Sequence, residues 1–266
     1  MNIVAVMPFR VTRNVDLERD EEDVEDLMEM IEDELRQRKF AQIVRLEHGP
    51  RPDPWILRFL IDELNLQPDE VYEVPGEMDY VGMRDIVAMN RPDLKFFPHN
   101  PVIPQVLHDD TVSIFQLIRE QPILLHHPYE SFQSSVERFV ASAADDPKVL
   151  SIKMTLYRTG DNSPFVRSLI RAAERNKNVT CLIELKARFD EETNIYLAEQ
   201  LEEAGVHVMY GVVGLKTHSK VTLIVRQDPD GMRSYAHIGT GNYHPGSAKQ
   251  YTDLGLLTAD PEICRD

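Results

Sequence analysis

Apolar and polar residues in the second half of the chain follow two alternating periods. Apolar side chains at every second position, Leu150, Ile152, Met154 and Leu156, predict a strand over residues 149–157. Apolar runs of strand length predict further strands at residues 179–184 and 206–210. Apolar residues at helical spacing predict helices at residues 131–144, 164–176 and 191–204. Because strands that alternate with helices are joined by right-handed crossovers, the pattern predicts an α/β fold with a largely parallel, mixed sheet flanked by helices.

The first part of the chain contains shorter elements. Apolar residues at helical spacing predict a helix over residues 21–38, which starts with acidic and ends with basic side chains, as the helix dipole favours. Asp53 followed by Pro54 is typical of a helix start and predicts a helix to Leu64. Strands are predicted at residues 3–7, 41–47 and 71–74. Together these elements predict a small mixed α/β unit.

A proline-rich stretch separates the two patterns. Residues 91–109 contain four prolines, which cannot continue a helix or pair within a central strand. This stretch therefore predicts a domain boundary, with one domain at residues 1–106 and a second at residues 107–266. A short helix near residues 113–119 is expected at the start of the second domain.

Composition and charge restrict the classes of function. The 266 residues are 42% hydrophobic and 28% charged, and the formal net charge of −16 argues against general affinity for nucleic acid. No apolar run is long enough to predict an integral membrane segment, and no secretory signal is apparent. Cys181 and Cys264 lie far apart and form no metal-like pair, which favours a reducing cytoplasm.

One short stretch suggests anion chemistry. Residues 214–220 place His218 between Lys216 and Lys220, just before an apolar run. Imidazole is a good nucleophile near neutral pH, and the two ammonium groups would hold a phosphate against it. Seven residues alone favour the alternative of a plain surface loop.

Further cations recur at predicted strand ends. Arg158 ends the strand over residues 149–157, Lys186 and Arg188 follow the next strand, and His218 follows the third. Ligands of such sheets collect at the carboxyl ends of the strands. Each cation alone is consistent with a solvated strand end, but the set predicts a phosphate site, with phosphoryl transfer through a phosphohistidine at His218.

Two other segments leave alternatives open. The small residues of 237–243 can lay backbone N–H groups and Asn242 against the same anion, or can form a plain glycine turn. The adjacent His126 and His127 lack a metal-ligand pattern, which favours a structural or ligand-adjacent role over a metal site.

The order of His218, Lys220 and a later glycine-rich segment with Asn242 resembles the phospholipase D superfamily. That superfamily usually places an aspartate five residues after the lysine, where this chain has Val225. The missing carboxylate argues against an ordinary phosphodiesterase.

A closer resemblance is to the bacterial polyphosphate kinases of the histidine-phosphorylated type, which have phospholipase D-like halves. It extends over essentially the whole chain. The matching segments are residues 8–13, 124–129, 155–158, 184–192, 214–220, 239–243 and 251–253.

The resemblance implies a fold, an activity and roles for residues. The chain would comprise a partial α/β head domain and a first phospholipase D-like catalytic domain, within a longer protein that forms a homo-oligomer. Such enzymes reversibly transfer the terminal phosphate of ATP to inorganic polyphosphate, leaving ADP, with Mg²⁺ as cofactor. His218 aligns with the phosphorylated histidine, and Arg158 and Arg188 with the Mg²⁺ and phosphate pocket. Because arginine is a poor metal ligand, both are interpreted as phosphate clamps.

Tyr251 aligns with a nucleotide-contacting tyrosine, and a tyrosine packed in the core is its alternative. Two other functions stay open for the chain as a whole. One is a phospholipase D-like phosphodiesterase, and the other is a non-catalytic anion-binding fragment.

Overall fold

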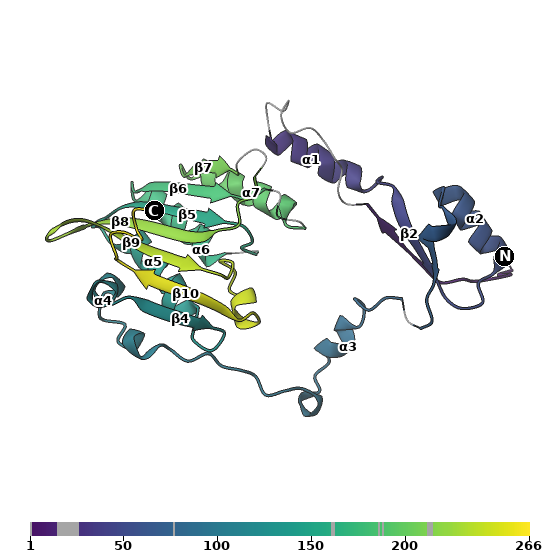
Figure 1. Cartoon of the computed structure of the whole chain (residues 1–266), viewed down its shortest axis with the longest axis horizontal. Coiled ribbons are helices and arrows are strands. Elements are labelled where there is room, and N and C mark those ends of the chain that lie inside the picture. Colours follow the sequence, from purple (N-terminus) through teal and green to yellow (C-terminus); the bar gives the residue numbers. More distant parts are fainter. Residues whose placement is uncertain are drawn as a thin grey trace. The chain divides into compact units, whose positions relative to one another are not determined.

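The protein, seen here as a computed structural model, folds into two compact units (Figure 1). The structure describes residues 2–14, 27–76, 78–160, 163–185, 187, 189–211 and 215–266. One unit comprises residues 1–20 and 32–98, and the other comprises 21–31 and 99–266. The division at residue 98 falls inside the proline-rich stretch.

The first unit contains a three-stranded sheet in the order β1-β2-β3, in which β1 and β2 are antiparallel and β2 and β3 are parallel. Ile43, Leu46 and Leu66 are the buried centre of its core. The elements up to residue 98 are β1 (Phe9–Arg13), α1 (Leu27–Arg38), β2 (Ile43–His48), α2 (Pro54–Leu64), β3 (Val71–Glu73), α3 (Arg84–Ala88) and 3₁₀ turns at Pro68–Glu70 and Pro92–Leu94.

Helix α2 begins as its sequence predicts. The Asp53 carboxylate accepts hydrogen bonds from the backbone N–H groups of Trp55 and Ile56, both at 3.0 Å, and so satisfies two donors of the first turn. Pro54 occupies the first helical position, and Asn65 ends the helix with a left-handed φ of 51°.

One predicted strand in the first part of the chain does not form, and one predicted helix is only partly covered by the described residues. The strand expected at residues 3–7 does not form: within the described residues the first strand is β1, and Ile3 and Val4 are 83% and 96% exposed. An apolar run forms a strand only where a neighbouring strand satisfies its backbone groups. The helix predicted from residue 21 is described from Leu27 onward, and residues 21–26 lie outside the described residues.

The second unit is built on a seven-stranded mixed sheet in the order β4-β10-β9-β8-β5-β6-β7. Its strands are β4 (Ile123–His127), β5 (Val149–Leu156), β6 (Asn178–Ile183), β7 (His207–Tyr210), β8 (Lys220–Asp228), β9 (Gly231–Gly239) and β10 (Asp253–Thr258). Its helices are α4 (Ile114–Glu120), a π-helical turn (Gln133–Glu137), α5 (Arg138–Asp145), α6 (Pro164–Glu174), α7 (Glu191–Glu203) and 3₁₀ turns at Gln105–Leu107 and Ser247–Lys249.

The expected α/β class and mixed sheet are confirmed, but the sheet is less parallel than the sequence pattern suggested. Among the described strands of this sheet, only β5, β6 and β7 pair in parallel, through the crossover helices α6 and α7. The β5–β8, β8–β9, β9–β10 and β10–β4 pairs are antiparallel. The alternation of strands and helices predicts parallel pairing only where a helix intervenes, and β8 is joined to β9 directly by a tight turn.

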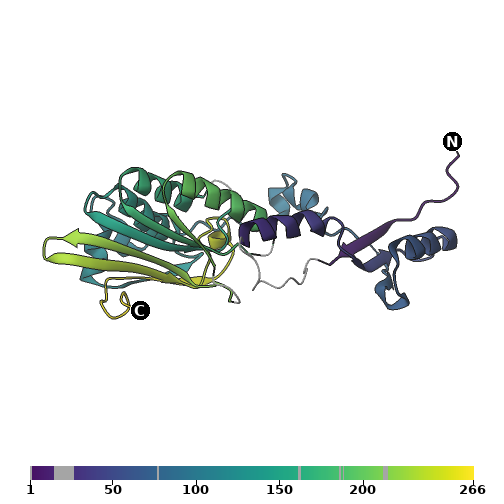
Figure 2. The same cartoon turned by 90° about the horizontal axis from the view of Figure 1, so that it is seen from above.

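Helices α5, α6 and α7 lie on one face of this sheet (Figure 2). Ile152, Met154 and Leu156 of β5 are buried, as their alternation predicts. Leu150, in contrast, is 44% exposed, because a register shift between Val149 and Ser151 turns it out of the alternation. Large apolar side chains also remain exposed on the other face, namely Leu124, Met209, Ile238 and Leu254.

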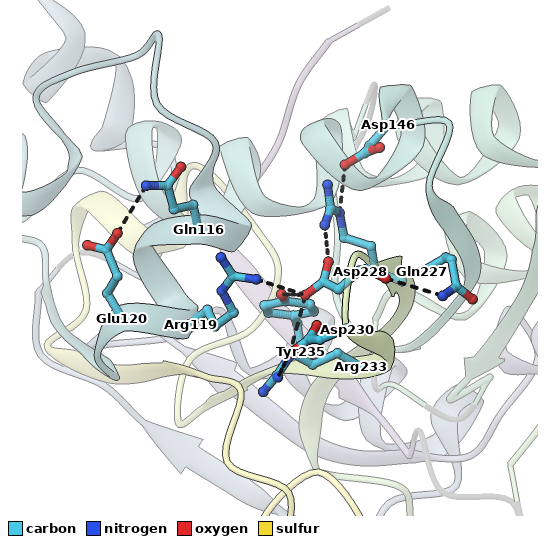
Figure 3. A network of polar contacts seen from close by, with 10 residues as sticks. Gln116, Arg119, Glu120, Asp146, Gln227, Asp228, Asp230, Arg233 and Tyr235 are labelled. Atoms are coloured by element: carbon cyan, nitrogen blue, oxygen red, sulfur yellow. Dashed lines mark hydrogen bonds and ion pairs between the residues drawn. The ribbon is translucent and has the colours of Figure 1, made fainter.

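The β8–β9 turn carries a dense set of charged contacts (Figure 3). Asp228, the last residue of β8, has a fully buried side chain that accepts a 2.5 Å hydrogen bond from the Tyr235 hydroxyl and pairs with Arg226. Arg226 also contacts Asp146 at 2.9 Å, and Arg233 lies 3.5 Å from Asp228. This cluster ties the start of β5 to the β8–β9 turn.

Candidate active site

The topology gathers seven strand ends at one edge of the seven-stranded sheet. Strands β4, β5, β6, β7 and β9 run toward this edge with their carboxyl ends, while β8 and β10, which are antiparallel to their neighbours, begin there. His218 lies two residues before the start of β8, so it lies at the edge where Arg158 follows β5. His218 follows the third parallel strand, β7, along the chain as expected, but it leads into β8, which pairs with β5 and not with β7.

The His218 side chain is exposed to solvent and packs against a tyrosine. The rings of Tyr157 and His218 meet edge to face with centroids 5.2 Å apart. The same tyrosine ring lies 5.7 Å from Lys216 Nζ and 5.1 Å from Lys220 Nζ. A single aromatic side chain therefore contacts the histidine and both lysines, and its electron-rich face attracts the two ammonium groups.

Lys220 is the buried cation of the site. It is 5% exposed, and its ammonium group donates a hydrogen bond to the backbone carbonyl of His218. Burial lowers the pKa of Lys220, while the negative charge of Asp253 acts in the opposite direction. The ammonium group is therefore close to both the histidine backbone and the start of β10.

Arg158 is held by an aspartate from the next crossover. Its Nε lies 2.5 Å from Asp190 Oδ2, and its side chain is 40% exposed. Asp190 is the residue before α7, so this pair joins the end of β5 to the start of that helix. Arg188 and Lys186, predicted at the same edge, lie outside the described residues.

The glycine-rich segment at residues 237–243 packs closely against Asp253, the first residue of β10. The Thr240 hydroxyl donates to Asp253 at 2.8 Å, and a Cβ at Gly241 would lie 2.5 Å from the Asp253 carboxylate, so only glycine permits this approach. Asn242 places a buried side-chain oxygen here, which has no hydrogen-bond partner among the described residues. These contacts hold Asp253 against the end of β9.

A buried polar chain lies beneath this edge. The Tyr243 hydroxyl accepts a 2.9 Å hydrogen bond from Thr222 and lies 2.8 Å from His237 Nδ1. Burial lowers the pKa of His237 to about 3, and the charge of His127 contributes in the same direction. His237 is therefore a neutral core histidine. A Cβ at Gly255 would lie 2.8 Å from its ring, so the imidazole occupies space that a glycine leaves open.

Tyr251, His126 and His127 were also candidates from the sequence; Tyr251 lies two residues before β10, and the two histidines end β4. Tyr251 is 64% exposed in the segment before β10, so the alternative of a core tyrosine is wrong. His127 is buried, its Nδ1 lies 2.9 Å from the Glu130 carbonyl, and burial lowers its pKa. His126 is exposed and stacks edge to face on Tyr129.

Three residues at this edge of the sheet were assigned no role from the sequence: Tyr157, Glu184 and Asp253. Each lies inside one of the segments that carry the family resemblance. Glu184 is 4% exposed, and its carboxylate accepts a 2.7 Å hydrogen bond from the backbone N–H of Thr217. The sequence did offer a signal for Glu184, because this charged residue directly follows an apolar strand. A glutamate at such a position is rarely buried unless its carboxylate has a partner.

Family models match both units of the chain. The model described as polyphosphate kinase C-terminal domain 1 matches residues 113–266, and the polyphosphate kinase middle domain matches residues 1–89. The chain belongs to the polyphosphate kinase family. The resemblance expected from the sequence motifs is thereby confirmed.

Individual relatives cover the whole of this chain. It is 48% identical over 268 residues to a polyphosphate kinase from Mycolicibacterium gilvum, and 47% identical over 274 residues to one from Streptomyces coelicolor. In both cases 100% of this chain is covered, and the chain spans 37% and 36% of these polyphosphate kinases. The crystal structure of polyphosphate kinase from Porphyromonas gingivalis matches with a TM-score of 0.69 and 30% identity, covering 84% of this chain and 34% of that one.

The described residues do not form a metal site of their own. No group of three or more His, Cys, Asp or Glu side chains among them could hold a metal ion. Magnesium prefers oxygen ligands, whereas Arg158 and Arg188 carry only N–H donors. These two arginines suit the phosphate oxygens of a ligand better than a bare cation.

No described helix is long and apolar enough to cross a membrane.

Proposed function

We propose that this chain carries the phosphoryl-transfer site of an ATP:polyphosphate phosphotransferase, with His218 as the residue that becomes phosphorylated. The observation that supports it most directly is an exposed imidazole packed on Tyr157, whose ring also lies within 5.7 Å of the ammonium groups of Lys216 and Lys220. An accessible nucleophile among cations suits attack on a phosphate. Because the chain spans 36–37% of its relatives, the activity concerns the full-length protein.

In the first half-reaction a ring nitrogen of His218 attacks the terminal phosphorus of ATP. The new N–P bond forms as the bond from phosphorus to the bridging oxygen breaks, and ADP leaves with that electron pair. In the second half-reaction a terminal oxygen of polyphosphate attacks the phosphohistidine, and the imidazole is released. Both steps are reversible.

The cations have distinct roles in this proposal. Arg158 and Arg188 clamp phosphate oxygens, and Lys216 and Lys220 stabilise charge that develops in the transition state. Asn242 contacts the same phosphates, and Tyr251 contacts the nucleotide. Mg²⁺ would arrive on the phosphates of ATP, so Arg158 and Arg188 would meet it only indirectly.

The domain and cellular context follow the family resemblance. Residues 1–106 are proposed as part of the head domain, and residues 107–266 as the catalytic domain with the phosphohistidine. We place the full-length protein in the cytoplasm, where the two cysteines of this chain would stay free. A homo-oligomer is proposed from the family resemblance alone. A phosphodiesterase is disfavoured, since Val225 stands inside β8 where that motif needs a carboxylate.

The test is phosphorylation of the full-length protein with ATP labelled on its terminal phosphate. We expect an acid-labile, base-stable label that is lost in His218→Ala. His207→Ala is the matched control, because His207 is an exposed histidine on β7 and should keep the label. A label that persists in His218→Ala would overturn the assignment. Polyphosphate binding without any label would favour an anion-binding module.

A further inference from the structure

Both neighbours of His218 are held by side chains from adjacent strands. On the amino side, the Thr217 N–H donates to the Glu184 carboxylate at 2.7 Å. On the carboxyl side, the Thr155 hydroxyl donates to the Ser219 carbonyl at 2.9 Å and accepts from the Val221 N–H at 3.0 Å. The backbone that carries the exposed imidazole is thus fixed on both sides.

The Glu184 anchor is itself built into the sheet. Its backbone N–H donates to the Leu156 carbonyl at 3.0 Å. The buried side-chain amide of Asn194 donates to the carbonyls of both Glu184 and Tyr157, each at 2.9 Å. The ends of β5 and β6 are therefore locked together, and the Glu184 carboxylate projects from this rigid base to the segment that carries His218.

The Thr155 side chain extends the pairing of β5 with β8 by one residue beyond the last backbone-paired position. The paired register of these strands ends at Met154 and Thr222. One residue further on, the Thr155 side chain bonds to the backbone on both sides of Lys220. The hydroxyl takes the place of backbone partners where the segment leaves the sheet toward His218.

We infer that Glu184 and Thr155 are positioning residues that hold His218 in the geometry needed for attack on phosphorus. Burying a carboxylate costs free energy unless it is hydrogen-bonded, and here the carboxylate accepts a backbone N–H next to the nucleophile. A nucleophile that is held in place reacts faster than a mobile one, and small misplacements cost large factors in rate. This inference rests on the proposed function of His218.

The test compares paired variants in the full-length protein. Glu184→Ala should lower kcat for phosphotransfer by about 10- to 100-fold, with KM for ATP changed by less than about twofold. Glu184→Gln keeps an acceptor oxygen and should stay within about threefold of wild type. Thr155→Val should lower kcat by about tenfold, and Thr155→Ser should restore it. Glu199→Ala, at an exposed glutamate of α7 outside the segments that carry the family resemblance, is the control and should not change kcat.

A second readout is independent of catalysis. Amide hydrogen exchange at Thr217 should accelerate in Glu184→Ala, and exchange at Val221 should accelerate in Thr155→Val. Wild-type kcat and unchanged exchange in both variants would overturn the inference. If Glu184→Ala does not fold, the Thr155→Val and Thr155→Ser pair decides it by the same criteria. Absence of phosphohistidine in the wild type would instead refute the proposed function, while accelerated exchange would still establish the two anchors.

Discussion

The aromatic ring of Tyr157 meets the imidazole of His218 edge to face, with ring centroids 5.2 Å apart. Tyr157 directly follows β5 and directly precedes Arg158, so it links the proposed nucleophile to a proposed phosphate clamp. Lys216 and Lys220 approach the same ring. One tyrosine ring thus contacts the histidine and both lysines.

Removing this ring should impair phosphorylation more than removing its hydroxyl. Tyr157→Ala should lower the rate of His218 phosphorylation by about 5- to 30-fold, because cation–π and ring contacts of roughly 1–2 kcal/mol are lost. Tyr157→Phe should stay within about twofold of wild type. Rates of label incorporation from ATP measure both variants. Tyr80→Ala, at a tyrosine that is 64% exposed in the first unit, serves as control. Equal losses in Tyr157→Phe and Tyr157→Ala would assign the role to the hydroxyl instead.

The Arg158–Asp190 pair predicts graded effects on transfer. Arg158→Ala should slow phosphotransfer by about 100- to 1,000-fold, the usual effect of removing one donor from a transition state, and Arg188→Ala should do the same. Asp190→Asn should have a smaller effect, because it leaves the guanidinium in place and weakens only its orientation at Nε. Steady-state kinetics with ATP and polyphosphate test whether the loss of rate is larger in Arg158→Ala than in Asp190→Asn. Arg58→Ala, in a side chain that is 85% exposed in the first unit, should have no effect. An Asp190→Asn defect as large as that of Arg158→Ala would contradict the order.

His237 predicts a loss of stability in mild acid. Its pKa is lowered to about 3 in the folded state from 6.5, so the unfolded state binds the proton first as pH falls. The contribution is at its full value above about pH 6.5 and is progressively lost toward about pH 3. Urea unfolding of wild type at about pH 7 and about pH 5 should show this loss, and His237→Gln should lose less between the same two values. Identical pH dependence of the two proteins would show that His237 is not the group responsible.

The cluster around Asp228 predicts a stability effect separate from phosphorylation. Asp228→Ala should lower the free energy of unfolding by about 3–5 kcal/mol, because it leaves Arg226 without its buried partner and removes the acceptor of Tyr235. Folded molecules should still phosphorylate His218, since the cluster lies at the β8–β9 turn, at the opposite end of β8. Denaturant unfolding and label incorporation measure the two effects. Asp230→Ala, at a side chain that is 57% exposed, is the control and should cost less than about 1 kcal/mol.

The elements of this chain were predictable to different degrees. The helices and the strands β5, β6 and β7 of the second unit follow hydrophobic periods that side-chain burial enforces, so their positions agree with the predicted ranges within a few residues. Strands β4, β9 and β10 were not predicted. The expected strand at residues 3–7 was wrong, because an apolar run says nothing about whether a partner strand exists. Leu150 was misplaced for a related reason, since a local register shift is set by the neighbouring strand and not by the residue itself.

What the sequence by itself determined is the chemistry of the site: His218 between two lysines, Arg158 at a strand end, and family segments spread over the chain. Residue types and their spacing record which groups are available for the proposed phosphoryl transfer. Only the tertiary structure decided how His218 is held, through Tyr157, Glu184 and Thr155. The physical reason is that β8 pairs antiparallel with β5, which brings its amino end to the carboxyl ends of β5 and β6. Contacts between residues 60 or more positions apart depend on that pairing, and no local pattern encodes it.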